Sequence, residues 1–195
     1  MKTTDFLSAC DVVDRDEPSV IECARSLVGR SINATAENCF HFVRDRIAHS
    51  ADAESGPVTL SASSVLKHGT GYCYAKSHLL AALLRANKIP AALCYQRLTI
   101  EDESGPFCLH GLNAVYLDEI GWYRIDARGN RPGIAAQFCP PVEALAFPLE
   151  HDGEKDLSGF YARPIPAVTT LLGTCSSWDE VLRQLPTTDP DTSIP

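Results

Sequence analysis

One cysteine differs from the other seven in its surroundings. Cys73 follows the turn GTGY and begins a stretch rich in Ala and Leu that predicts a helix. Gly69 and Gly71 permit a tight backbone approach or a positive φ just ahead of it. A thiol at a helix N-terminus lies near unpaired N–H groups, which favour the thiolate and could stabilise an oxyanion. Cys73 is therefore a candidate nucleophile, although an inert buried cysteine at a helix start is the simpler alternative.

Thiolate chemistry on acyl groups needs a base, and the base needs an orienting partner. His110 opens one predicted strand, and Asp126 lies near the end of the next. If Tyr116 pairs with Trp122 in a hairpin, Asp126 falls opposite Leu112. It then shares the face of His110 at a diagonal distance of roughly 7–8 Å between backbones. A register shifted by one residue would place the two on opposite faces, so the catalytic hypothesis requires the first register or a bulge.

The elements that must position these residues follow the hydrophobic pattern. Helical periodicity predicts helices at 17–28, 36–48 (with Thr35 as N-cap), 61–67 and 72–87, and a capping-box pattern predicts a short helix from Ser177 to about Leu185. Strands are expected at 91–100, 109–117 and 122–127. Helices first and strands second indicate an α+β fold with an antiparallel sheet. We expect one domain over 1–185 and a flexible tail over 186–195.

Composition excludes several classes of partner. The chain has 195 residues and a net charge of −8, which suits one domain and disfavours a nucleic-acid groove or an anionic membrane surface. The longest apolar run is far shorter than the roughly 20 residues of a spanning helix, and the N-terminus has no apolar signal-peptide core. A cytoplasmic protein with no nucleic-acid or membrane partner is expected.

The eight cysteines form no C-x-x-C pair, which disfavours a zinc ribbon or a thioredoxin-like site. In a reducing compartment we expect free thiols, most of them packed as small core hydrophobes. Neither metal-ligand spacing, a phosphate loop nor a dinucleotide fingerprint is present, so we expect no cofactor.

The order of these motifs resembles the transglutaminase-like superfamily, a branch of the papain-like cysteine enzymes with small bacterial-type members. The resemblance covers about 61–129 and is carried by SASSVLKHGTGYCYAKSHLLAALLRANKIPA, HGLNAVYL and GWYRIDARG. It implies a papain-like α+β core in which the nucleophile helix packs on an antiparallel sheet. It further implies Cys73 as nucleophile, His110 as general base and acid, and Asp126 as the residue that orients His110. It also suggests that Trp122 packs near the site.

One departure concerns the oxyanion hole. Papain-like proteases carry a Gln six positions before the cysteine, where this chain has Lys67, and animal transglutaminases use an upstream Trp that is absent here. The Cys73 N–H can be one donor, and the sequence does not identify the second. Further candidates for the cleft share only their proximity to these motifs: Tyr72, Tyr95, Gln96, Trp122, His68, Asp52 and Arg128.

The resemblance implies cysteine-dependent acyl transfer or hydrolysis of an amide in a peptide, protein or small molecule, as in a protease, amidase, deamidase or transglutaminase. Three alternatives stay open: a non-catalytic binding module on the same fold, a redox sensor that uses Cys73 alone, and an arylamine acetyltransferase-like enzyme. The last usually needs a longer chain. The sequence leaves the natural substrate and the oligomeric state open.

Overall fold

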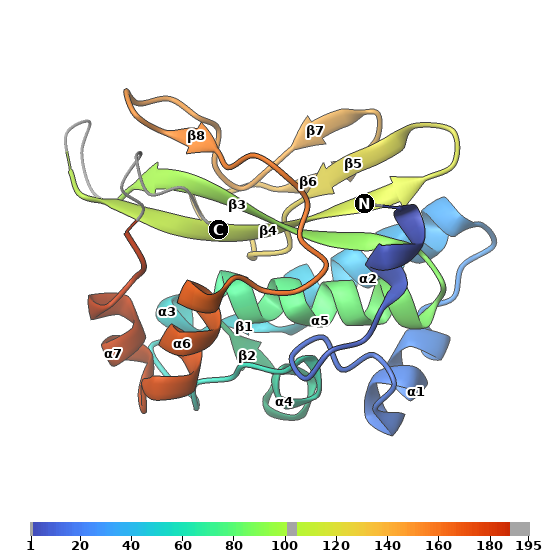
Figure 1. Cartoon of the computed structure of the whole chain (residues 1–195), viewed down its shortest axis with the longest axis horizontal. Helices are drawn as coiled ribbons and strands as arrows, with labels where there is room; N and C mark the ends of the chain where they lie inside the picture. Colours follow the sequence, from blue (N-terminus) through green and yellow to red (C-terminus); the bar gives the residue numbers. More distant parts are fainter. Residues whose placement is uncertain (1, 101–104, 188–195) are drawn as a thin grey trace.

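The helices and the main sheet form two layers, with the sheet on one side of the molecule and most helices on the other (Figure 1). The computed structural model of the chain describes residues 2–100 and 105–187. The predicted α+β class is confirmed. Within the described ranges, no helix combines the length and the apolar character that a membrane crossing requires.

The first half of the chain is mainly helical. Its helices are η1 (Thr3–Leu7), α1 (Pro18–Ser26), α2 (Ile32–Arg46), α3 (Ser50–Ala53), α4 (Ala62–His68) and α5 (Cys73–Ala86). Two short parallel strands, β1 (Ala48–His49) and β2 (Thr70–Gly71), lie between them. The second half supplies β3 (Ala91–Thr99), β4 (Phe107–Leu117), β5 (Gly121–Ile125), β6 (Gln137–Cys139), β7 (Val142–Ala144) and β8 (Lys155–Asp156), followed by α6 (Pro166–Thr174) and α7 (Trp178–Arg183).

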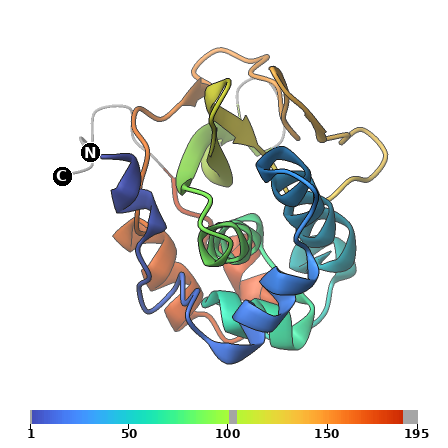
Figure 2. The same cartoon turned by 90° about the vertical axis from the view of Figure 1, so that its right-hand side faces the viewer.

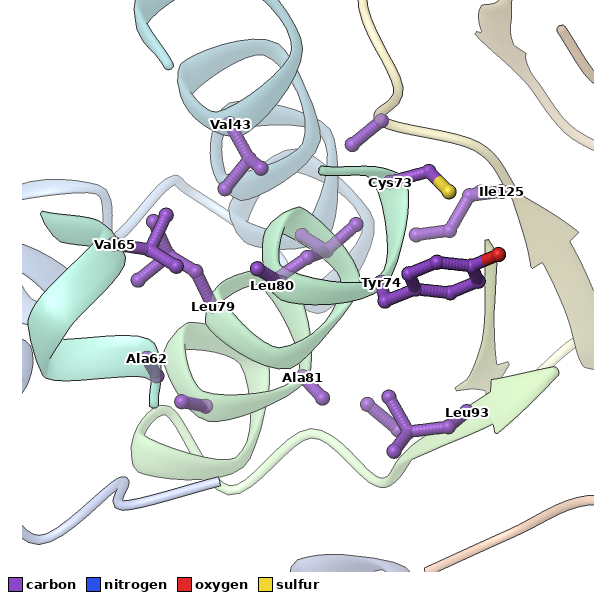
Figure 3. Close-up of a cluster of buried hydrophobic side chains, with 14 of the residues drawn as sticks. Val43, Ala62, Val65, Cys73, Tyr74, Leu79, Leu80, Ala81, Leu93 and Ile125 are labelled. Atoms are coloured by element: carbon purple, nitrogen blue, oxygen red, sulfur yellow. The ribbon is translucent and has the colours of Figure 1, made fainter. Parts of the chain in front are cut away.

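Helix α5 is the centre of the molecule. Figure 2 looks along it and shows other helices around it and the sheet above. Side chains of α2, α4 and β3, among them Val43, Val65 and Leu93, surround it (Figure 3). The sequence predicts one broad apolar face, but every residue from Cys73 to Arg85 is buried. The central position of α5 explains the difference, because neighbouring elements cover its polar face as well as its apolar face.

The buried polar side chains of α5 are hydrogen-bonded to backbone carbonyls. Lys76 donates to the carbonyl of Ile47, and His78 Nδ1 lies 2.8 Å from the carbonyl oxygen of Leu60. Arg85 donates twice to the carbonyl of Ala91, at 2.9 and 2.7 Å. These bonds compensate the burial of polar groups, which is costly when they lack partners.

The main sheet is antiparallel, with strand order β5-β4-β3-β8. β3 pairs with β4 from Ala91 opposite Val115 to Thr99 opposite Phe107. β4 pairs with β5 in the register that the catalytic hypothesis required, with Tyr116 opposite Trp122. The pairing ends at Asn113 opposite Ile125, so β5 does not cover the part of β4 that carries His110.

Several helices differ from the sequence prediction, and η1 and α3 lie in segments for which the sequence predicts no helix. α2 begins at Ile32 rather than 36, because the Ser31 side chain caps it by accepting from the N–H of Ala34 at 3.1 Å. The sequence predicts no helix in the Pro-rich segment beyond Gly129, where α6 forms. Pro166 lies in the first turn of α6, a position that accommodates proline well.

The start of the predicted tail is attached to the sheet. The carbonyl of Pro186 accepts a hydrogen bond from the N–H of Leu109 at 2.9 Å. The segment expected to be a flexible tail thus begins with a backbone hydrogen bond to β4. Residues 188–195 of that tail lie outside the described residues.

Glycine at position 111 lets the first turn of α5 lie directly against β4. A Cβ at Gly111 would come within 2.8 Å of Tyr74 Cδ1, 3.1 Å of its Cα and 3.3 Å of its backbone nitrogen. Two of these three atoms are backbone, so the clash cannot be relieved by moving a side chain alone. The closeness of helix and strand therefore depends on this glycine.

We expect Gly111→Ala to lower the free energy of unfolding by about 1–3 kcal/mol, the usual cost of overpacking a core. Urea denaturation followed by circular dichroism would measure it. The matched control is Gly173→Ala in α6, where a Cβ meets no atom within 4 Å. There the added methyl should be neutral or stabilising. Equal stability of Gly111→Ala and the wild type would contradict the steric argument.

Candidate active site

The chain before Cys73 is shaped by two glycines with different roles. Gly69 ends α4 in the left-handed conformation, with φ of 65°. Gly71 lies where a Cβ would approach Thr59 Oγ1 to 3.0 Å and the Cβ of Ala75 to 3.1 Å. One glycine thus supplies the positive φ and the other the close approach. Extended Tyr72 then precedes Cys73, the first residue of α5.

His110 and Asp126 meet as the register implies. His110 Nε2 lies 2.7 Å from Asp126 Oδ2, and both side chains are buried. The carboxylate also accepts from the N–H of Arg128 at 3.0 Å and from that of Ala146 at 3.1 Å. Three donors therefore fix the orientation of Asp126, and Asp126 in turn fixes the imidazole ring.

Cys73 lies close enough to His110 for its charge and a side-chain hydrogen bond to affect the ring. Because Nε2 is bonded to Asp126, Nδ1 is the ring nitrogen left for the thiol. The contact is possible because β5 stops short of His110 and Gly111 admits the start of α5. Cys73, His110 and Asp126 thus come together from α5, β4 and the end of β5.

The electrostatics of the pair favour a charged imidazole. Burial alone would lower the pKa of His110, but the negative charges of Asp126 and Cys73 and their hydrogen bonds raise it to about 10. Burial would raise the pKa of Asp126, yet the charge of His110 and the three hydrogen bonds lower it. At neutral pH the site therefore holds a protonated ring beside a carboxylate.

A cavity of about 640 Å³ opens over Cys73 and His110. Its apolar lining includes Leu98, Ile100, Leu109, Phe147, Pro148, Leu182 and Leu185. Its polar lining includes His49, Asp52, Tyr72, Arg128, Arg131, Glu150, His151 and Glu154. Cys73 itself is 7% exposed, so the thiol is reached through this cavity rather than from an open surface.

Two residues that the sequence placed at the cleft, Asp52 and Arg128, form an ion pair on its wall. Arg128 donates to both carboxylate oxygens of Asp52, one of them at 2.9 Å, and the guanidinium is buried. A paired, buried arginine is not free to bind a substrate carboxylate. The pair instead holds the segment after Asp126 against α3.

Of the other cleft candidates, Tyr72 lines the cavity, and its hydroxyl donates to the carbonyl of Trp178. Tyr95 and Gln96 are buried in β3 and do not line it. The Tyr95 hydroxyl accepts from the N–H of Ile165 at 3.3 Å, and Gln96 Nε2 donates to Asp156 at 3.0 Å. Placing these two in the cleft was wrong, because neighbouring segments cover both.

Trp122 and His68 are also placed elsewhere. The Trp122 ring packs edge-on against Phe6, with 4.8 Å between centroids, in a separate cluster away from the cavity. His68, the last residue of α4, is exposed and lies at a different surface hollow, beside Ser64 and Lys67. The prediction that Trp122 packs near the site is therefore wrong. The N-terminal segment, which carries Phe6, covers the face of the sheet on which Trp122 lies.

Among the cavity residues that sequence reasoning missed, His49 and Phe147 lie beside the cluster of Cys73 and His110. His49 lies on β1, directly opposite Gly71 of β2, and so close to Cys73. Phe147 packs edge-on against the His110 ring at 4.9 Å between centroids. Neither belongs to a motif, and only the pairing of distant segments brings them to the site.

A metal would need a cluster of suitable ligands. Within 2–100 and 105–187, no three His, Cys, Asp or Glu side chains gather closely enough to hold one. All eight cysteines are free, and half of them are buried.

The family model for the transglutaminase-like superfamily matches residues 26–127, more than half of the chain. The chain belongs to this superfamily. The matched segment runs from the end of α1 to just beyond Asp126, so it contains the complete cluster of Cys73, His110 and Asp126. No curated protein matches the chain.

Solved structures are similar to the chain at low identity. A candidate cysteine protease from Cytophaga hutchinsonii is similar with a TM-score of 0.51 and 18% identity, over 65% of this chain and 42% of that one. The periplasmic domain of TgpA from Pseudomonas aeruginosa has a TM-score of 0.49 and 16% identity, over 65% of this chain and 48% of that domain. The chain thus spans less than half the length of either structure.

The charged state of His110 can be tested by nuclear magnetic resonance of its ring nitrogens. We expect the ring to stay protonated well above its ordinary pKa of 6.5 and to release the proton near pH 10. Asp126→Asn should lower the pKa of His110, because burial is then opposed by Cys73 alone. Buried His78, whose pKa burial lowers to about 4, is an internal control that should stay neutral from pH 6 to 9.

The same shift links stability to pH. Between pH 6.5 and about 10 the folded chain keeps a proton that the unfolded chain releases. The contribution of His110 to stability is therefore complete below 6.5 and is lost as pH rises through this range. The pH dependence of the melting temperature, compared between wild type and Asp126→Asn, should show this loss only in the wild type. Parallel curves would argue against the pair.

Proposed function

We propose that the protein is a cysteine enzyme that cleaves or transfers the acyl group of an amide, with Cys73 as nucleophile, His110 as general acid and base, and Asp126 as the residue that orients His110. The observation that carries this proposal is the buried His110–Asp126 hydrogen bond of 2.7 Å on the same ring that interacts with Cys73. An inert cysteine would not require an imidazole oriented in this way.

In the first step, Cys73 attacks as a thiolate beside the protonated ring of His110: its sulfur forms a bond to the substrate carbonyl carbon, and the C=O π electrons move onto the oxygen. When that pair returns, the bond between carbon and the leaving nitrogen breaks. The protonated ring of His110 gives its proton to that nitrogen, so that an amine leaves and a thioester remains. The raised pKa of His110 supports its role as the acid of this step.

In the second step, neutral His110 takes a proton from water or from a second amine, which attacks the thioester carbon. The carbon–sulfur bond breaks, and Cys73 leaves as thiolate beside the newly protonated ring. Water gives hydrolysis and an amine gives transfer. Asp126 holds its orientation through both steps because it is bonded to the N–H groups of Arg128 and Ala146 as well.

The cavity suits an amide within a peptide, a protein or a small molecule. Two of its apolar lining residues are largely exposed, Ile100 at 42% and Leu182 at 45%. These side chains can pack against the apolar part of a substrate while the amide carbonyl lies at Cys73. The opposite charges of Asp52 and Arg128 are paired with each other, so this ion pair adds no net charge to the cavity wall.

Alkylation by iodoacetamide at neutral pH tests whether Cys73 is activated. Cys139 is exposed whereas Cys73 is buried, so access alone would favour Cys139. If His110 activates the thiol, Cys73 should be labelled faster, and His110→Gln should abolish this preference. Peptide mass mapping after short labelling times measures both rates. Faster labelling of Cys139 in the wild type would favour a non-catalytic binding module.

Acylation by p-nitrophenyl acetate tests the chemistry itself. We expect release of p-nitrophenolate together with an acetyl group on Cys73, and Cys73→Ala should abolish both without unfolding the chain. Asp126→Asn should slow acylation by about 10²–10⁴-fold, because His110 loses the partner that orients it beside the thiol. Asp156→Asn is the matched control, because this carboxylate binds Gln96 and Arg124 away from the cavity. Full activity of Cys73→Ala would refute the proposed nucleophile.

A further inference from the structure

An oxyanion at Cys73 has one donor in the Cys73 backbone N–H, and a neighbouring side chain can supply a second. Most polar side chains beside Cys73 are already engaged. The Tyr72 hydroxyl donates to the carbonyl of Trp178, and the Tyr74 hydroxyl donates to that of Leu109. The guanidinium of Arg128 is bound by Asp52. His110 is committed to acid–base chemistry.

His49 is different, because its ring has no hydrogen-bond partner in the described part of the chain. Nδ1 is fully buried and unpartnered, and the side chain lines the cavity that opens over Cys73. Nε2 makes no hydrogen bond with residues 2–100 or 105–187 either, but it is not fully buried. The ring nitrogen open to the cavity is therefore Nε2.

The backbone holds His49 beside the nucleophile. β1 and β2 run parallel, with His49 opposite Gly71, two residues before Cys73. α3 begins directly after His49, and α5 begins directly after Tyr72. Both segments therefore leave the β1–β2 pair and enter a helix at the same end of that pair. The His49 ring packs edge-on against the Tyr72 ring at 5.3 Å between centroids, which fixes its orientation.

The protonation state of His49 suits a neutral donor. Burial and the positive charge of Arg128 lower the pKa of His49 to about 3, although Asp52 opposes them. At neutral pH the ring thus carries a single proton. Nδ1 has no acceptor within the described residues, and a buried N–H without an acceptor is costly, so the proton belongs on Nε2.

From this geometry we infer that His49 Nε2–H is the second donor of the oxyanion hole, acting together with the backbone N–H of Cys73. The inference rests on the proposed function. As the Cys73 sulfur bonds to the carbonyl carbon and the π pair moves onto oxygen, both N–H groups donate to that oxygen. A neutral imidazole stabilises the charge without adding a second acid beside His110.

Two reactions of Cys73 separate this role from activation of the thiol. Alkylation by iodoacetamide forms no oxyanion, whereas acetylation by p-nitrophenyl acetate does. His49→Phe keeps an aromatic ring against Tyr72 but removes the donor. We expect it to slow acetylation by about 10²–10³-fold, the effect of losing one oxyanion donor, while the alkylation rate of Cys73 stays near that of the wild type.

His49→Gln supplies an amide N–H in place of the imidazole and should be acetylated faster than His49→Phe. His49→Gln also provides a second variant at this position if His49→Phe fails to fold. His41→Phe is the matched control, since His41 lies on α2 beside Glu37 and Asp45, outside the cavity. It should react at the wild-type rate in both assays.

Each remaining outcome overturns the inference. Acetylation of His49→Phe, or of an equally donor-free His49→Leu, at the wild-type rate would remove His49 from the oxyanion hole and leave the proposed function standing. Equal slowing of alkylation and acetylation would mean that His49 acts on the thiol instead. A wild-type protein whose Cys73 is alkylated rapidly but never acetylated would refute the proposed function, and the oxyanion hole with it.

Discussion

The site depends on the contact between the first turn of α5 and β4. The backbone of Tyr74 lies so close to Gly111 that a single added carbon would meet two of its main-chain atoms. His110 precedes that glycine and Cys73 precedes that tyrosine, so the same contact sets the separation of thiol and imidazole. The Tyr74 hydroxyl, which donates to the carbonyl of Leu109, fixes the contact further. Steric fit between two backbones, rather than attraction between the two reactive groups, thus determines the geometry.

The early end of β5 has two consequences. It leaves the part of β4 that carries His110 free of β5, which gives Cys73 its access. It also places Asp126 where the chain leaves the sheet, so the carboxylate can accept from the N–H groups of Arg128 and Ala146. Had β5 continued pairing, the strand would have covered that part of β4. The carboxylate would then lack these local donors, which lower its pKa against the effect of burial.

The features that depend on residues close together in the sequence were predicted correctly. The alternation of β4 and β5 correctly placed His110 and Asp126 on one face in the observed register, and the glycines before Cys73 predicted the turn. The same alternation places Trp122 on that face, but Phe6 from the N-terminal segment covers it there. His49 could not be found from sequence, because a two-residue parallel pairing brings it to Gly71. Contacts between distant segments decide which residues of a face reach the cavity.

The polar residues of α5 explain why this helix can lie at the centre of the molecule and still present a reactive end. Lys76 and Arg85 are buried, and each binds carbonyls where another element ends or begins, at Ile47 and at Ala91. These bonds attach the helix to the segment that leads into β1 and to the first residue of β3. The helix therefore has fixed neighbours on every side, including β1, which carries His49. A nucleophile at the end of such a helix needs little reorganisation when charge develops on a substrate, which is the condition under which fixed dipoles stabilise a transition state most effectively.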